Sequence, residues 1–322
     1  MSNAAQAIGA GARGRGRLAD YAPTYGALAA LVLLVVANSA LTPNFLDVNN
    51  FRNILLQVSP TVLVAVGMTF VIATGGIDLS VGSVMAIASA VAAASLDGGA
   101  GVAVLLGLLA ALAAGVFNGV LISGFRIQPI IVTLALLISG RGVAQVLSDG
   151  RLVPFSDPSF EFLGRGVVAG LPVQVIVMVL VVALAIFAMR ATAFGRYVVA
   201  VGGNEAASRL AGIKVHRTKI MVYALSGLLA GLAGLIETAR LGASDAQKVG
   251  LNIELDAIAA TVVGGTPLTG GRATVVGTLI GALIMQMITT SFNMNGIKFS
   301  WSLVIKAAII IVAVYIQRPK LA

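Results

Sequence analysis

Long apolar stretches alternate with short polar links along almost the whole chain. A helix needs about 20 apolar residues to cross the hydrocarbon core of a bilayer, because each residue adds about 1.5 Å. Nine stretches reach or approach that length and predict membrane helices: residues 25–41, 54–74, 81–96, 102–125, 129–147, 173–189, 220–241, 273–292 and 301–317. The pattern therefore predicts an all-α, polytopic membrane protein.

A tenth element is shorter than the others. Only Ala257 to Val263 is apolar between the polar residues 242–256 and the glycine-rich residues 264–271. Because so short a run cannot cross a hydrocarbon core that needs about 20 residues, we expect a short or broken helix that is buried within the bundle.

The composition excludes several classes of protein. Hydrophobic residues make up 58% of the chain and charged residues 10%, whereas a soluble domain has roughly a quarter charged residues. We attribute the net charge of +9 to basic loops and expect no nucleic-acid partner. The chain has no cysteine, so disulfides and thiolate chemistry are excluded, and its one histidine, His216, is expected to be solvated rather than a metal ligand.

The one long polar interval, residues 190–219, holds six basic residues and a single acid, Glu205. Basic residues concentrate in the cytoplasmic loops of membrane proteins, so we place this interval in the cytoplasm. Asn204 can cap a short helix from Glu205 to Leu210, and Gly212 can end it. A short helix with its own start and stop is typical of a docking element.

The distribution of basic residues also predicts the orientation. With ten spans, 13 Lys/Arg lie on the side of residues 190–219 and seven on the other side, which favours both termini in the cytoplasm. Residues 1–24 are rich in Gly, Ala and Arg and predict a disordered, basic cytoplasmic tail. Residues 25–322 form the transmembrane domain.

Two glycine-rich breaks interrupt the apolar pattern, at 75–82 and 264–271. Five of their eight positions match at an offset of 189 residues. Broken helices at corresponding positions of two halves indicate a transport site, so we expect about ten helices in two related halves. The alternative is two unrelated glycine-rich turns. The helix count makes the repeats parallel, and one miscounted helix would make them inverted.

Polar residues within these breaks and spans are candidates for a substrate pathway. Asp78 is either a pathway carboxylate or the N-cap of the helix that follows, with Ser80 as a competing cap, and the cap is the favoured interpretation. Lys306, inside the last span, either extends to the membrane surface or pairs within the bundle, and the first is the favoured interpretation. The pathway candidates are Gly75, Gly76, Asp78, Ser80, Asn118, Thr133, Gly264, Gly265 and Asn293, with Gln128 and Arg141 as further polar candidates. Helix-packing hydrogen bonds are the alternative explanation for each side chain.

Three pairs of glycines four residues apart lie within predicted spans. They are Gly115 and Gly119, Gly227 and Gly231, and Gly277 and Gly281. Small residues at this spacing allow the backbones of two helices to approach closely in lipid. We therefore expect these glycines to mark helix-packing contacts.

Four segments together resemble one known family. The segments are GGIDLSVGSVMA from Gly75, PxIVTLALLxxxRG from Pro129, GRYVVAVGGNEAASRLAGI from Gly195 and VVGGTPLTGGRATVVGTLIGA from Val262. They are similar to segments of the ribose/xylose/arabinose/galactofuranose-type permeases of bacterial ABC importers. The resemblance runs from about Leu41 to Arg318. It implies a permease subunit in the bacterial inner membrane that moves a monosaccharide.

The resemblance also implies partners. These are a second permease copy, a periplasmic sugar-binding protein and a cytoplasmic ATPase subunit that binds ATP and Mg, so that this chain has no catalytic site and no cofactor. It implies that an ATPase-coupling segment includes Gly195, Arg196, Gly202, Gly203, Asn204, Glu205, Ala206, Ala207 and Gly212.

Two other functions fit the pattern of spans and breaks. An ion-coupled secondary transporter of a small polar solute also uses repeats and broken helices, but it usually needs several intramembrane acids. A channel would need a ring of repeated polar residues as its filter. The coupling segment favours the ABC permease over both.

Overall fold

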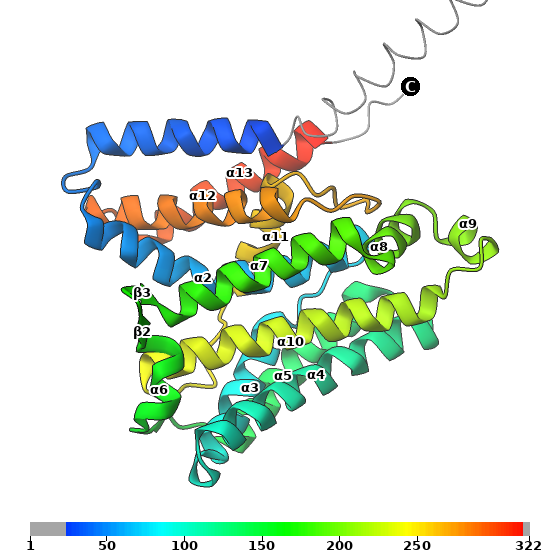
Figure 1. Ribbon diagram of the computed structural model, residues 1–322, viewed down its shortest axis with the longest axis horizontal. Coiled ribbons are helices and arrows are strands. Elements are labelled where there is room, and N and C mark those ends of the chain that lie inside the picture. Colours follow the sequence, from blue (N-terminus) through cyan, green and yellow to red (C-terminus); the bar gives the residue numbers. More distant parts are fainter. Residues whose placement is uncertain (1–23, 318–322) are drawn as a thin grey trace, which may run out of the picture.

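The computed structural model of the protein describes residues 24–317, so the predicted tail lies outside the described residues apart from its last residue. The helices are α1 (Thr24–Leu41), α2 (Val48–Ala73), α3 (Val81–Ala94), η1 (Leu96–Gly98), α4 (Ala100–Gly124), α5 (Pro129–Leu147), α6 (Pro158–Arg165), α7 (Val173–Ala191), α8 (Ala193–Gly203), α9 (Glu205–Leu210), α10 (Val215–Leu241), α11 (Ile253–Val263), α12 (Val275–Met294) and α13 (Phe299–Gln317). Figure 1 shows the long helices side by side in one bundle.

Strands are few and short. β1 (Val153–Pro154) pairs antiparallel with β4 (Ala243–Ser244), and β2 (Val167–Val168) pairs antiparallel with β3 (Leu171–Pro172). All four lie in the links around α6 and at the end of α10. The all-α fold class is therefore confirmed.

Each of the ten predicted elements is present as a helix. Seven helices of the described chain are long and apolar enough to cross a membrane, and α3 and α13 are shorter apolar helices. The expected short element is α11, whose 11 residues span about 16 Å at 1.5 Å per residue. The sequence pattern did not predict α6 and α8.

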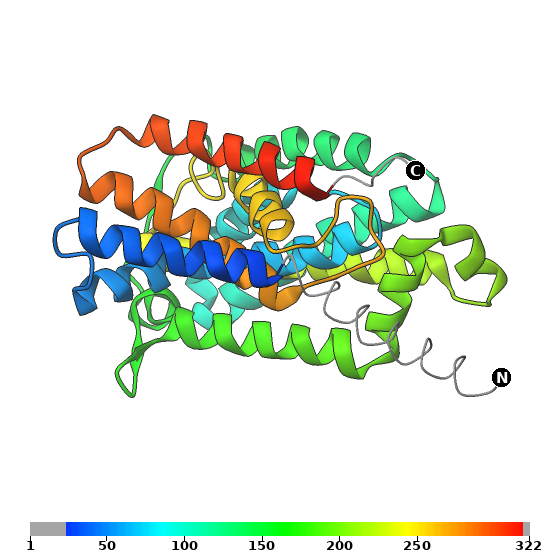
Figure 2. The same ribbon diagram turned by 90° about the horizontal axis from the view of Figure 1, so that it is seen from above.

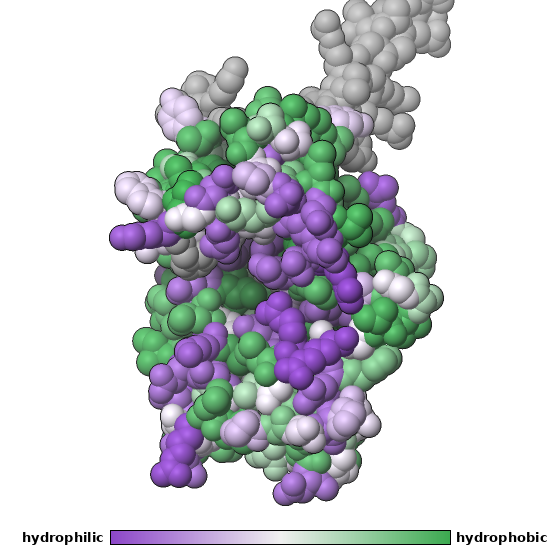
Figure 3. Space-filling model, turned by 90° about the vertical axis from the view of Figure 1, so that its left-hand side faces the viewer, coloured by the Kyte–Doolittle hydropathy of each residue, from purple (hydrophilic) through white to green (hydrophobic). Residues whose placement is uncertain are grey.

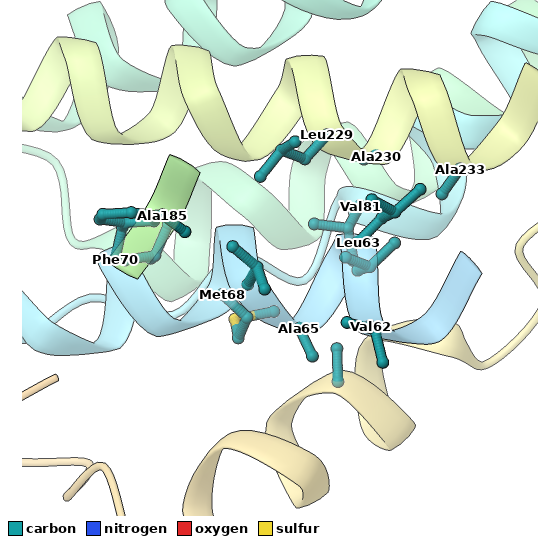
Figure 4. Close-up of a cluster of buried hydrophobic side chains, with 14 of the residues drawn as sticks. Val62, Leu63, Ala65, Met68, Phe70, Val81, Ala185, Leu229, Ala230 and Ala233 are labelled. Atoms are coloured by element: carbon teal, nitrogen blue, oxygen red, sulfur yellow. The ribbon is translucent and has the colours of Figure 1, made fainter. Parts of the chain in front are cut away.

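The helices α2 and α10 form the centre of the bundle. Residues 58–73 of α2 are buried except for Thr61, which is partly exposed. Figure 4 shows Leu63 of α2 beside Val81 of α3, on the side of α2 that faces α10. An apolar helix of a membrane protein can also face lipid, as the more apolar but less buried α4 and α7 show, so the burial of α2 follows from its packing against α10, α11 and α12.

The predicted glycine pairs mark the closest helix contacts. A methyl group added to Gly227 of α10 would lie 2.9 Å from the Cα atom of Gly115 in α4. On α12, Gly277 faces Gly264 and Gly281 faces Ala260, so the third pair packs against α11 and its end. The expected role of these glycines in close packing is confirmed.

Both ends of the described chain lie at the end of the bundle that carries α8 and α9 (Figures 1 and 2). Thr24 and Tyr25 share a cavity with Arg190 at the end of α7 and Val199 of α8. An even number of crossings returns a chain to its starting side, so this placement agrees with ten spans.

The contact between α4 and α10 allows a direct test of the packing. Gly115→Ala would place a methyl group against the backbone carbonyl of Tyr223, whereas Gly101→Ala on the same helix meets nothing within 4 Å. Overpacking costs about 1–3 kcal/mol, so we expect Gly115→Ala to lower the midpoint of thermal unfolding by several degrees and Gly101→Ala to leave it unchanged. Equal midpoints for the two variants would contradict the packing.

Candidate functional site

The broken helices α2 and α11 end in the same kind of turn. At the end of α2, the Gly75 N–H bonds to the carbonyl three residues earlier (2.8 Å) and the Gly76 N–H to the carbonyl five residues earlier (3.1 Å). At the end of α11, Gly265 and Thr266 repeat this pattern at 2.9 and 3.1 Å. Gly75 and Gly265 have φ of 79° and 96°, the left-handed conformation that favours glycine at such helix ends.

The pairing of residues across the two breaks differs from the predicted one. The turns make Gly75 equivalent to Gly265, whereas the ungapped offset of 189 residues pairs it with Gly264. The links to the next helix also differ in length, 74–80 before α3 and 264–274 before α12. The prediction of two broken helices is confirmed, but the residue-by-residue pairing is wrong because an ungapped comparison cannot accommodate links of unequal length.

The two breaks lie against each other. The Gly271 N–H donates to the Ala73 carbonyl at 3.0 Å, which satisfies one of the last carbonyl groups of α2. A methyl group on Gly270 would lie 2.8 Å from the Gly75 nitrogen, so the backbones touch without side chains between them. The two breaks are therefore in direct backbone contact.

The end of α8 packs into the same place. A methyl group on Gly202 would overlap the Ala73 carbonyl oxygen of the first break and lie 2.6 Å from the Gly271 nitrogen of the second. Gly203 has more room, with only the Gly271 Cα atom 4.0 Å from such a methyl group. Gly202, which was predicted only as a coupling residue, thus touches the backbone at both breaks, and sequence reasoning did not find this contact.

Asp78 is buried and fully hydrogen-bonded. Its exposed fraction is 1%. One carboxylate oxygen, Oδ1, accepts hydrogen bonds from the Ser80 N–H (3.1 Å) and the Ser80 hydroxyl (2.6 Å). The other, Oδ2, accepts one from the Ser226 hydroxyl of α10 (2.8 Å). These bonds join the first break to α10.

The favoured interpretation of Asp78 as the N-cap of α3 is wrong. Ser80 occupies the N-cap position and makes no side-chain cap bond. Its hydroxyl donates to Asp78 and accepts a bond from the Asn118 amide of α4 (2.8 Å). Asp78 instead lies two residues before the N-cap, as the acceptor that holds Ser80 in place.

The other pathway candidates separate into two places. Thr133 of α5 is buried, and its hydroxyl lies 3.0 Å from the Pro129 carbonyl and 3.3 Å from the Ile77 carbonyl of the first break. Asn118 also contacts this break. Asn293 is exposed in the last turn of α12, at the far end from the second break, so the structure does not bring it to the others.

Two residues of α10 were missed. The Tyr223 hydroxyl is buried beside Gly76 and has no hydrogen-bond partner within the described residues, and Ser226 binds Asp78. Their spacing of three residues places both on one face of α10. The sequence feature that could have identified them is this pair of polar residues just before Gly227 in an otherwise apolar span.

Arg141 and Lys306 have structural partners. The Arg141 guanidinium donates to the carbonyls of Ala246 (2.9 Å) and Val249 (2.6 Å), which holds the link between α10 and α11. The Lys306 ammonium is 7% exposed and lies 2.9 Å from the Asp256 carboxylate of α11. The expectation that Lys306 extends to the membrane surface is wrong, because an acid within the bundle pairs with it.

The predicted short helix is present with the predicted boundaries. In α9, the Asn204 side chain accepts a hydrogen bond from the Ala207 N–H at 2.9 Å, and Gly212 follows the helix with φ of 80°. Ala206 and Ala207 are exposed, and Leu210 is 91% exposed at the end of α9. An isolated, exposed leucine on a helix tip is suited to insertion into a partner's groove.

Ion pairs hold α9 against α10. The Glu205 carboxylate contacts Lys219 of α10 at 2.6 Å and Arg209 of α9 at 3.0 Å. The hydrogen bond from Lys219 lowers the pKa of Glu205 below its usual value of 4.5. This stabilisation is therefore present above the unfolded-state pKa and is lost as the pH falls through the lowered folded-state value.

The remaining coupling candidates lie on α8. Gly195 is buried against Met189 at the end of α7, and Arg196 is exposed. No group of three or more His, Asp or Glu side chains within residues 24–317 could hold a metal ion. The site thus consists of two helix breaks, the α8 contact and an exposed helix.

Comparisons with known proteins agree with this arrangement. Residues 50–314 match the family described as the branched-chain amino acid transport system / permease component. The chain is 44% identical over 299 residues to the ribose import permease protein of Escherichia coli (strain K12), covering 91% of this chain and 93% of that protein. It is 43% identical to the ribose import permease protein of Bacillus subtilis (strain 168), covering 92% and 93%.

The name of a third relative specifies a sugar other than ribose. The galactofuranose transporter permease protein of Escherichia coli (strain K12) is 39% identical over 303 residues, covering 91% of this chain and 89% of that protein. No solved structure matches the chain. The match over residues 50–314 nevertheless means that this chain belongs to the family of branched-chain amino acid transport system permease components.

Proposed function

We propose that this chain is the membrane permease of an ATP-driven ABC importer and moves a monosaccharide into the cytoplasm. The observation that carries the proposal is the direct contact between Gly202 at the end of α8 and both helix breaks. The exposed helix α9 follows α8 after the single residue Asn204, so only α8 lies between a partner bound to α9 and the breaks. The sugar-importing relatives support the choice of a monosaccharide.

The proposed orientation places α8 and α9 in the cytoplasm of a bacterium and the protein in its inner membrane. Both ends of the described chain then face the cytoplasm (Figure 1). The excess of basic residues on that side supports this orientation. In this proposal the α9 end binds a cytoplasmic ATPase subunit, which holds ATP and Mg, and this chain has no catalytic site.

The opposite end would face the periplasm. Figure 3 shows polar residues gathered there around a hollow with an apolar floor. Exposed polar side chains at the start of α2 and the end of α12 contribute to this end, among them Asp47, Asn49, Arg52, Asn293 and Lys298. We propose that a periplasmic sugar-binding protein docks here, and that a second copy of the chain completes the permease.

We assign the first break a positioning role in the substrate pathway. Hydrogen bonds join Asp78 to Ser80, Ser80 to Asn118, and Thr133 to the Ile77 carbonyl, so most of these polar atoms hold the break together. The glycines Gly75, Gly76, Gly264 and Gly265 allow the breaks to bend and to pack. In this proposal these residues set the shape of the pathway, and the sugar hydroxyls form their hydrogen bonds with other residues.

An ion-coupled secondary transporter is the alternative function. Such a carrier needs an acid that gains and loses a cation during transport. The Asp78 carboxylate accepts three hydrogen bonds, and the Asp256 carboxylate is paired with Lys306. Neither acid is therefore free to bind and release a cation. The discriminating experiment is sugar uptake with and without the co-expressed ATPase. We expect uptake only with the ATPase, and uptake without it would favour the secondary transporter.

Glu205→Lys tests the role of α9. The change removes the ion pair with Lys219 that joins α9 to α10 and the pair with Arg209 within α9, and it reverses the charge at this position. We expect normal abundance of the permease in the membrane but at least a tenfold loss of sugar-stimulated ATP hydrolysis by the assembled complex, about 1.4 kcal/mol. Hydrolysis by the ATPase subunit alone is the control. Normal stimulation in the variant complex would contradict the assignment.

Asp78→Asn tests the positioning role of Asp78. An asparagine oxygen can accept both bonds from Ser80, and its amide can donate to the Ser226 hydroxyl. We therefore expect nearly normal abundance and uptake for Asp78→Asn but a large loss of abundance for Asp78→Leu. Leucine leaves buried donors unsatisfied, at about 1–3 kcal/mol each.

The exposed Asp97, near the other end of α3, provides the matched control, since Asp97→Leu should keep normal abundance. A loss of uptake of tenfold or more in Asp78→Asn at normal abundance would show instead that the negative charge itself works in transport.

A further inference from the structure

A cavity of about 260 Å³ lies where α4 ends, α5 begins and α9 meets the start of α10. A second hollow of about 650 Å³ shares Arg126, Arg209 and His216 with it and adds Lys214 and Arg217. Both lie at the end of the bundle that carries α9. None of the helix breaks lines either cavity, so they are separate from the site described above.

The charges around these cavities are unbalanced. Five basic residues line them, Arg126, Arg209, Lys214, Arg217 and Lys219, against one acid, Glu205. Glu205 is already paired with Arg209 and Lys219. Within residues 24–317, no hydrogen bond or ion pair joins the side chains of Arg126, Lys214 and Arg217 to another residue. Positive charges gathered in this way attract an anion.

The cavity walls also include apolar groups. Ile122, Ile127 and Pro129 line the smaller cavity together with the basic side chains. Phe125 and Ile131, beside it at the end of α4 and the start of α5, are 70% and 57% exposed. The apolar spans of α4 and α5 end here, so the cavity lies at the depth of the lipid head groups.

We propose that the two cavities, which share Arg126, Arg209 and His216, together bind the head group of an anionic phospholipid of the cytoplasmic leaflet. The phosphate lies against Arg126 and Arg217, and the acyl chains run along the exposed apolar faces of α4 and α5. The inference rests on the orientation given under the proposed function. Basic pockets between membrane helices on the cytoplasmic side are suited to such head groups.

The combination of charge and apolar surface selects this ligand. A soluble phosphate would use only the cationic wall and would gain nothing from the exposed apolar side chains. An acidic segment of the ATPase would have no use for a surface that continues along the membrane spans. A phospholipid matches both parts, because its charge and its hydrocarbon are joined at the same depth.

Native mass spectrometry of the full-length purified permease tests the proposal. Phosphatidylglycerol is compared with phosphatidylcholine of the same acyl chains, and inorganic phosphate is added as a competitor. The test variant is Arg126→Gln with Arg217→Gln. The control, Arg151→Gln with Lys248→Gln, removes the same charge from exposed residues that follow α5 and α10 at the other end of the bundle.

The wild type and the control should retain phosphatidylglycerol in preference to phosphatidylcholine, and the test variant should bind it on the order of tenfold more weakly. Equal retention by test and control variants, or no preference for the anionic lipid, would overturn the proposal. So would full displacement by inorganic phosphate. Unchanged lipid binding together with lost assembly with the ATPase would assign the surface to the protein partner instead.

A photoactivatable phosphatidylglycerol provides a second measurement on the wild-type chain, so the result does not depend on the folding of a variant. Cross-links should concentrate in residues 122–131 and 209–219. Their confinement to other spans would overturn the assignment. The ATP hydrolysis of the assembled complex is measured separately, so failure of the lipid site and failure of the importer function remain distinguishable.

Discussion

A helix that ends against other parts of a protein leaves its last carbonyl groups without partners in its own helix, so they need hydrogen-bond donors from elsewhere. The structure depends on how α2 and α11 meet this requirement. Each closes its end with the same glycine turn, and the Ala73 carbonyl of α2 receives the Gly271 N–H of the other break. The contact between the two breaks is therefore made by backbone groups, and Gly270 and Gly271 of the second break allow this close approach.

This contact positions the rest of the bundle. Because the backbones touch, α8 can bring Gly202 against both breaks, and no side chain larger than hydrogen fits there. The Asp78 carboxylate then joins the first break to α10 through Ser226. The helix α10 is packed on α4 through glycine contacts and holds α9 through the pair between Lys219 and Glu205. The exposed coupling segment and the buried breaks are thus parts of one connected set of contacts.

Local chemistry explains what could be predicted from the sequence. Asn204, Glu205 and Gly212 act within a few residues of one another, so the limits of α9 followed from capping rules alone. The membrane helices and the short α11 followed from the length of the apolar runs. The two breaks were visible because glycine clusters interrupt those runs.

The missed features depend on contacts between residues far apart in the chain. No local pattern indicates that Ser226 binds Asp78 or that Lys306 pairs with Asp256. The extent of α8 was missed because its last two residues are glycines, which usually indicate a loop. The residue pairing between the breaks was wrong by one position, since the two links that follow them differ in length.

The central claim is that a movement of α8 reaches both breaks directly. Hydrogen–deuterium exchange of the assembled permease and ATPase, with and without ATP, measures this movement at the backbone amides. The account predicts that exchange in residues 74–80 and 264–271 changes together with exchange in α8 when ATP binds. A change confined to α8 and α9, with both breaks unaffected, would contradict it.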